Sequence, residues 1–137
     1  MVTALNTLNV LIVVDVEGAT TSGDLGSNVY LIDSSKYFGS GQEGQDELVT
    51  ACVDGQIIIW SITPVNPGDD AQISGFMGQM VDSGVCSPKQ VTIQPGETAW
   101  SGRVESQGKT GNFQYTCNLS FEGKVMSFDP FLNVKTS

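Results

Sequence analysis

Apolar and polar residues alternate along much of the chain with a period of two, which is the period of a β-strand. The clearest example is NFQYTCNLSF, residues 112–121, in which aromatic and apolar residues alternate with Asn, Gln, Thr and Ser. The pair Glu122-Gly123 then predicts a turn into a second strand over residues 124–134. The C-terminal part of the chain is therefore predicted to form a β-hairpin.

The same reading predicts further strands over residues 8–17, 28–33, 47–53, 56–63, 71–80, 90–93 and 98–106. Asp54-Gly55 is typical of a hairpin turn and predicts that the strands on either side of it pair. No segment shows a sustained period of 3.6 residues with helix caps. Eight or nine short strands predict an all-β fold, an antiparallel β-sandwich of the two-sheet immunoglobulin-like or cupredoxin-like type. A length of 137 residues suits one domain, predicted to span residues 1–137.

The first predicted strand ends in two acids. In NVLIVVDVEG, residues 9–18, an apolar run leads to Asp15 and Glu17 at the spacing i, i+2. On a strand this spacing places both carboxylates on one face. Three interpretations follow: a catalytic pair, half of a metal site, or a strand end exposed to water.

The absence of histidine narrows these interpretations. It excludes Ser-His-Asp and Cys-His catalysis and zinc or copper sites with histidine ligands. An enzyme would have to use Asp15 and Glu17 in a barrel cavity, and no nucleophile lies near them in the sequence. The sequence therefore favours a non-enzymatic protein.

The net charge is −9, with a pI near 4.1 and no basic cluster. Such a surface repels the phosphates of nucleic acid and of anionic lipid, so neither is an expected partner. A cation or a small neutral ligand, including a glycan, is compatible with it.

Three cysteines, Cys52, Cys86 and Cys117, lack metal-site spacing, and we expect buried free thiols, although one pair could bridge. The N-terminal segment has no basic region, and its apolar run breaks at Asp15. It resembles neither a signal peptide nor a membrane span, so no membrane insertion is expected. The expected location is the cytoplasm, with non-classical release as the alternative.

Several carboxylates and one amide fall in predicted loops or at strand ends, where oxygen ligands for sugar hydroxyls or a hard cation are often found. The candidate ligand-binding residues are Asp15, Glu17, Asp24, Asn28, Asp33, Asp69 and Asp70, and the candidate calcium ligands among them are Asp15 and Glu17. For each acid taken singly, exposure to water is the alternative. Trp60 and Trp100 are predicted to lie in the core, whereas Tyr30, Tyr37, Phe38 and Phe76 lie nearer to loops, where an aromatic ring beside an acid suits a neutral sugar.

Four segments, LNVLIVVDVEG, DGQIIIWSIT, QISGF and YTCNLSFEGKVMSFDPFLNV, resemble the AidA/PixA inclusion-body protein family from about residue 8 to residue 134. The resemblance implies a β-sandwich, assembly into inclusions or oligomers and, for some members, calcium-dependent sugar binding, without enzymatic activity. Many members carry an Asn/Pro-rich insert where this chain has only ATTSGDLGSN, residues 19–28.

These observations leave three hypotheses. The first is a lectin-like binding module for a neutral sugar, bound directly or through calcium. The second is a structural protein that self-assembles into homo-oligomers or inclusions through sheet edges and the C-terminal hairpin. The third is an enzyme that uses Asp15 and Glu17.

Overall fold

The protein is described by a computed structural model that covers residues 7–33, 48–66, 68–94, 97–121 and 123–135. Its strands are β1 (Leu8–Val14), β2 (Val29–Asp33), β3 (Val49–Val53), β4 (Ile57–Pro64), β5 (Gln72–Met77), β6 (Lys89–Gln94), β7 (Glu97–Arg103), β8 (Gly111–Gln114), β9 (Thr116–Phe121), β10 (Lys124–Phe128) and β11 (Phe131–Lys135). Two short α-helices, α1 (Val16–Ser22) and α2 (Gln79–Asp82), and one 3₁₀ turn, η1 (Gly26–Asn28), connect them.

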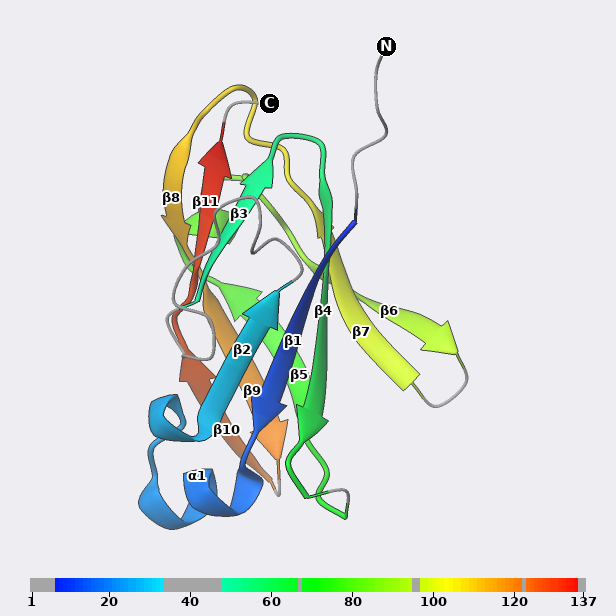
Figure 1. Ribbon diagram of the computed structural model, residues 1–137, viewed down its shortest axis with the longest axis vertical. Helices are drawn as coiled ribbons and strands as arrows, with labels where there is room; N and C mark the ends of the chain where they lie inside the picture. Colours follow the sequence, from blue (N-terminus) through cyan, green and yellow to red (C-terminus); the bar gives the residue numbers. More distant parts are fainter. Residues whose placement is uncertain (1–6, 34–47, 67, 95–96, 122, 136–137) are drawn as a thin grey trace.

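The strands form two layers (Figure 1). One layer is a five-stranded sheet in the order β2-β1-β4-β7-β6, and the other contains the three-stranded sheets β10-β9-β5 and β3-β11-β8. This confirms the predicted all-β sandwich. The prediction of purely antiparallel sheets was incomplete, because β1 pairs with β4 and β3 pairs with β11 in parallel.

The core lies between the layers and is built by alternation along the strands. In β1, Leu8, Val10, Ile12 and Val14 are buried while the residues between them are more exposed. The same alternation in β9 buries Cys117, Leu119 and Phe121 from the opposite layer. Burial of these two apolar faces is the main source of stability of such a sandwich.

An aromatic cluster joins the two layers. Trp60 in β4 is fully buried, as predicted, and its Nε1 donates a hydrogen bond to Tyr115 Oη at 3.2 Å. The Phe76 ring lies 4.8 Å from Trp60 and 5.5 Å from Trp100, centroid to centroid. Aromatic packing of this kind fixes the spacing between the sheets at this point.

The two predicted C-terminal strands each cross from one sheet to another. The segment 112–121 divides at Tyr115 into β8 and β9, and the segment 124–134 divides at Asp129-Pro130 into β10 and β11. The two breaks lie side by side, since Tyr115 N donates to Pro130 O at 3.0 Å. The predicted hairpin is confirmed for β9 and β10, which pair antiparallel.

The predicted hairpin around Asp54-Gly55 is wrong. The two residues form a turn, but β3 and β4 belong to different sheets in different layers. Asp54 Oδ1 accepts a hydrogen bond from Ser106 N at 2.8 Å, and Gly55 N donates to Val104 O at 2.7 Å. These bonds attach the turn to the segment after β7, so that the chain moves between layers instead of returning along β3.

The first strand ends earlier than predicted. β1 stops at Val14, and Asp15 is the N-cap of α1, with its Oδ1 accepting from Gly18 N at 3.0 Å. The prediction of a strand to residue 17 was therefore wrong, because a capping aspartate starts a helical turn here. Gly23, at φ 74°, ends the helix, and its N–H bonds to Ala19 O.

Candidate functional site

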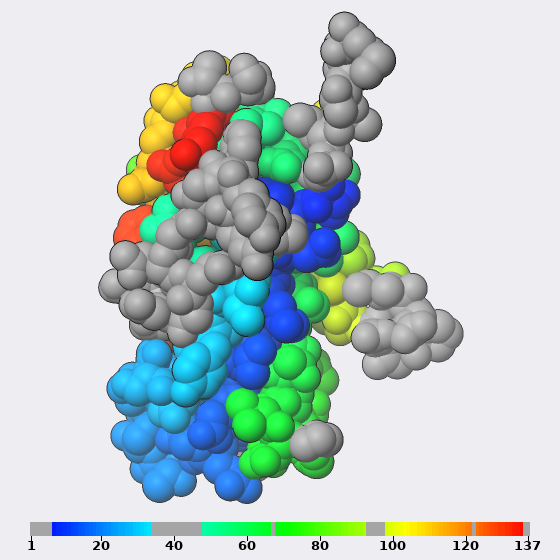
Figure 2. Space-filling view, viewed as in Figure 1, coloured from blue at the N-terminus to red at the C-terminus, as the bar shows by residue number. Residues whose placement is uncertain are grey.

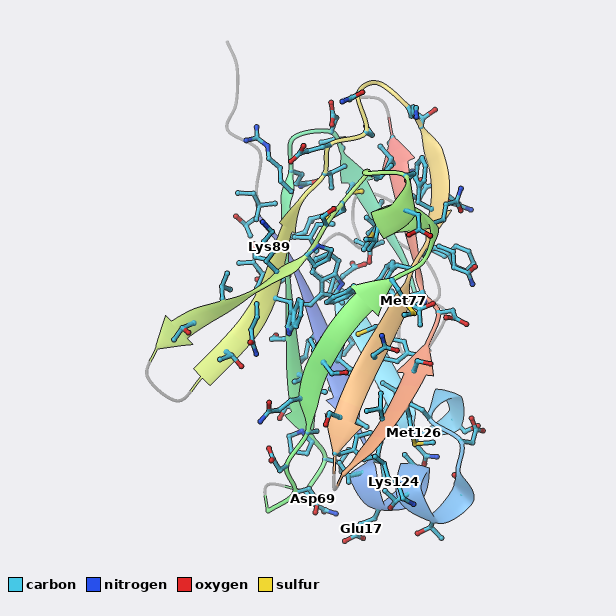
Figure 3. The ribbon with its side chains drawn as sticks, turned by 180° about the vertical axis from the view of Figure 1, so that it is seen from behind. Glu17, Asp69, Met77, Lys89, Lys124 and Met126 are labelled. Carbon is cyan, nitrogen blue, oxygen red and sulfur yellow. The ribbon has the colours of Figure 1, made fainter. Side chains whose placement is uncertain are left out.

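Most of the predicted site residues lie at one end of the sandwich. Asp15, Glu17, Asp24 and Asn28 belong to the α1–η1 segment that follows β1, and Asp69 and Asp70 belong to the loop that follows β4. β1 and β4 are parallel, so both segments leave the sheet at the same end, where Val65 N donates to Val14 O at 2.8 Å. Figure 3 shows Glu17 and Asp69 at that end.

The α1–η1 segment uses its polar side chains for its own structure. Asn28 Nδ2 donates to Asp24 O at 2.8 Å and to Ser22 Oγ at 3.2 Å, and Ser27 Oγ donates to Asp24 Oδ2 at 2.6 Å. Gly18 packs so closely against Asn28 that an added Cβ would collide with the Asn28 carboxamide. Three of the residues proposed as ligands here, Asp15, Asp24 and Asn28, already have side-chain partners within the segment.

The predicted pairing of Asp15 with Glu17 on one strand face is wrong. Asp15 caps α1 and the exposed Glu17 lies in its first turn, where a spacing of two residues separates side chains around the axis. In the described part of the chain, no group of three or more His, Cys, Asp or Glu residues is arranged to hold a metal ion. A calcium role for these two acids stays a prediction.

Asp33 lies at the other end of β2, away from the other candidates. It is only 4% exposed, and Thr50 Oγ1 donates a hydrogen bond to its Oδ2 at 2.7 Å. This bond joins β2 of one layer to β3 of the other. The observed contact gives Asp33 a structural part in the interior, whereas the sequence placed it at an accessible strand end.

The three cysteines are free and buried, as predicted. Burial raises the pKa of Cys52 to about 12, with a further contribution from the Asp33 charge, and burial likewise raises the pKa of Cys86 to about 12. Burial also raises the pKa of Cys117. Nucleophilic cysteines need the thiolate, so these thiols are not suited to covalent catalysis near neutral pH.

A cavity of about 190 Å³ opens near the end of the sandwich that carries Asp69 and Asp70. It lies where β7 and the end of β4 face the start of β5, beside the β6–β7 hairpin that projects from the body of the protein (Figure 1). The residues that line it are Ile62, Asp70, Ala71, Gln72, Ile73, Thr98, Ala99 and Trp100.

Trp100 is the largest side chain of this pocket, and it is held in place. It is half-buried, its Nε1 donates to Ile73 O at 3.1 Å, and Phe76 packs against it. Asp70, Gln72 and Thr98 line the same pocket and are exposed. A fixed indole beside a carboxylate, an amide and a hydroxyl provides apolar contact and hydrogen bonding within one small cavity.

Of the residues predicted as ligands, only Asp70 lines this pocket. Trp100 was assigned to the core, and Gln72 and Thr98 were not considered. The signal available in the sequence was the alternation of Thr98, Trp100 and Gly102 with residues of the opposite face of a strand. That pattern could not show that Trp100 lies at the edge of the core instead of its centre.

Fold and pocket together define a β-sandwich with a small cavity that is lined in part by an aromatic side chain. The chain belongs to the family described as "Domain of unknown function (DUF8788)", whose model matches residues 6–127. No curated protein matches the sequence.

Among solved structures, the crystal structure of an inclusion body protein (PixA) from Burkholderia cenocepacia J2315 is similar to this chain, with a TM-score of 0.71 at 16% identity over 98% of both chains. This likeness confirms the fold that the resemblance to the AidA/PixA family implied. The endo-fucoidan hydrolase MfFcnA4 of glycoside hydrolase family 107 aligns at a TM-score of 0.38 and 12% identity, over 65% of this chain and 13% of its own. Within the described residues, no helix has the length and apolar character needed to cross a membrane.

Proposed function

We propose that the protein is a non-enzymatic binding module that takes a small neutral sugar in the Trp100 pocket. The observation that carries this proposal is the combination of a fixed, half-buried indole with Asp70, Gln72 and Thr98 around one cavity of about 190 Å³. A sugar ring offers apolar C–H faces to an aromatic surface and hydroxyls to carboxylate, amide and hydroxyl groups.

The charge of the protein favours a neutral ligand over an anionic one. The net charge of the chain is −9, and the charged side chain in the lining of the pocket is that of Asp70, a carboxylate. A carboxylate accepts hydrogen bonds from two hydroxyls of a sugar but repels a phosphate, a sulfate or a uronic acid.

Direct hydrogen bonding to the sugar is favoured over a bridging calcium ion. The described residues provide no cluster of three or more carboxylates at this end of the sandwich. The calcium-assisted form predicts that sugar binding depends on calcium. The oxygen that could serve it is Asp69 Oδ2, which is buried without a hydrogen-bond partner, next in sequence to the pocket residue Asp70.

The test is a panel of neutral monosaccharides titrated by calorimetry, with calcium and with a chelator, against the wild type and four variants. Asp70→Ala removes a charged acceptor and should weaken binding about 10-fold or more, and Gln72→Ala should weaken it about 3- to 10-fold. The matched controls are Asp82→Ala and Gln114→Ala, which truncate exposed residues outside the pocket and should leave affinity unchanged.

Equal losses in the pocket variants and in their controls would contradict the location of the site. Absence of binding to any neutral sugar in either solution would remove the proposal. Binding that requires calcium would replace direct hydroxyl contacts by the calcium-assisted form.

A further inference from the structure

The outer face of the five-stranded sheet is apolar over its centre. Five of the eight large apolar side chains that are exposed in the described part of the chain point outward from this sheet. They are Leu11 (37% exposed), Tyr30 (49%), Ile32 (48%), Ile57 (44%) and Val91 (39%), which we call the outer apolar face.

The strand register places these side chains on one surface. Leu11 lies opposite Ile32 across β1 and β2, and the Tyr30 partner in β1 is Val13. The inward neighbours Val10 and Trp60 pair with each other and are buried, so Leu11 and the residues in phase with it face away from the core. Figure 2 views this side of the protein, with β1 in dark blue and β2 in cyan at the surface.

Charge distinguishes this face from the rest of the protein. Among its outward positions whose side chains are described, none carries a carboxylate, and its charged groups are Lys89 and Arg103 on β6 and β7. The described acids lie mainly in loops and at strand ends, on a chain with a net charge of −9. The described side chains of this face therefore bring no carboxylates together when two copies of this acidic protein approach through it.

The in-plane size of the face is close to what a small dimer interface needs. Five strands about 4.8 Å apart and about seven residues long span roughly 550 Å² in plane, before side-chain relief is counted. Stable interfaces of the smaller class bury roughly 600 Å² on each partner. An apolar sheet face also packs well on a second sheet face of the same kind, as the two layers inside a sandwich do.

We propose that two copies of the chain associate face to face through the outer apolar face, forming a dimer with two-fold symmetry. This inference goes beyond the sugar-binding proposal and does not depend on it, because the Trp100 pocket is formed by the opposite, inward side of the sheet and by β5. It also differs from the expectation that assembly uses sheet edges and the C-terminal hairpin.

The experiment measures the mass of the full chain in solution by light scattering and its dissociation constant by sedimentation equilibrium. The wild type should show twice the 14.5 kDa mass of one chain. Ile32→Lys and, separately, Tyr30→Lys place a charge in the contact and should weaken the dimer at least about tenfold. Both changes make the net charge less negative, so non-specific repulsion cannot explain a dissociation.

Val125→Lys is the matched control, because Val125 is 66% exposed on β10 of the C-terminal hairpin, outside the outer apolar face. This variant should remain a dimer. Circular dichroism identifies any variant that fails to fold, and since Tyr30 and Ile32 are tested separately, one folded variant decides the matter. A monomeric wild type, a dimer unaffected by both lysines, or a dimer broken equally by Val125→Lys would overturn the proposal.

Discussion

Asp15 and Gly18 illustrate how single residues decide the conformation after the first strand. Asp15 accepts from Gly18 N, and the absence of a side chain at Gly18 makes room for Asn28, which in turn binds Asp24 O and Ser22 Oγ. The capping role of Asp15 could have been predicted, since aspartate is a preferred N-cap. The contact between Gly18 and Asn28 could not, because the two residues meet only after the chain has turned back.

Gly18→Ala tests this packing. Alanine is the better helix former by about 1 kcal/mol, but its Cβ would displace the Asn28 side chain and break its two hydrogen bonds. We expect a net loss of about 1–2 kcal/mol in the free energy of unfolding, measured by denaturant titration. Thr21→Ala, at an exposed position of the same helix, should be neutral or slightly stabilising. Equal or higher stability of Gly18→Ala would refute the packing argument.

At the scale of elements, the C-terminal hairpin was predictable, whereas the hairpin predicted at Asp54-Gly55 was wrong and pairings between distant strands were not predictable. The β6–β7 and β9–β10 hairpins join strands that are adjacent in sequence, and Glu122-Gly123 indicated the second of them. The parallel pairs β1–β4 and β3–β11 join strands that are far apart in the chain, and strand alternation carries no information about which partner is chosen. The hairpin at Asp54-Gly55 was predicted wrongly for the same reason, because a turn signal between two strands does not show that the two strands pair with each other.

Asp54→Ala tests the turn that carries the chain from β3 to β4. It removes the acceptor of the part-buried Ser106 N–H, and we expect a loss of about 1–2 kcal/mol in the free energy of unfolding. Asp54→Asn retains an acceptor oxygen at the same place and should keep most of that stability. If both variants lose the same amount, the hydrogen bond to Ser106 is not what stabilises the turn.

At the scale of the whole molecule, the alternation of apolar and polar residues predicted the sandwich, but it did not predict the pocket. Its lining comes from the end of β4, from residues 70–73 and from residues 98–100, which meet only when the two layers pack. The sequence directed attention to the acids of the loops, and of these only Asp70 lines the pocket. Trp100 was overlooked because a tryptophan in an alternating strand suits a core equally well.

The packed interior predicts a loss of stability at alkaline pH. The pKa values of Cys52 and Cys86 are raised from 9.0 to about 12, so above pH 9 the unfolded chain releases thiol protons that the folded chain keeps. The stabilisation is complete below pH 9 and is lost as the pH rises towards 12, by about 1.4 kcal/mol per pH unit for each thiol. Guanidinium unfolding between pH 8 and 11 measures the slope of the free energy of unfolding against pH. Cys52→Ala should reduce this slope by the contribution of one thiol, about 1.4 kcal/mol per pH unit. An unchanged slope in that variant would be inconsistent with this account.

The most direct test of the central claim, that a sugar binds in the pocket lined by Trp100, is the indole N–H region of a ¹⁵N-labelled protein spectrum. The sequence has two tryptophans, so Trp60, fully buried and bonded to Tyr115, is an internal control for Trp100. Titration with the neutral sugar panel should shift the Trp100 signal in a saturable way and leave the Trp60 signal in place. A Trp100 signal unmoved by every sugar, or a Trp60 signal that shifts alone, would contradict the claim.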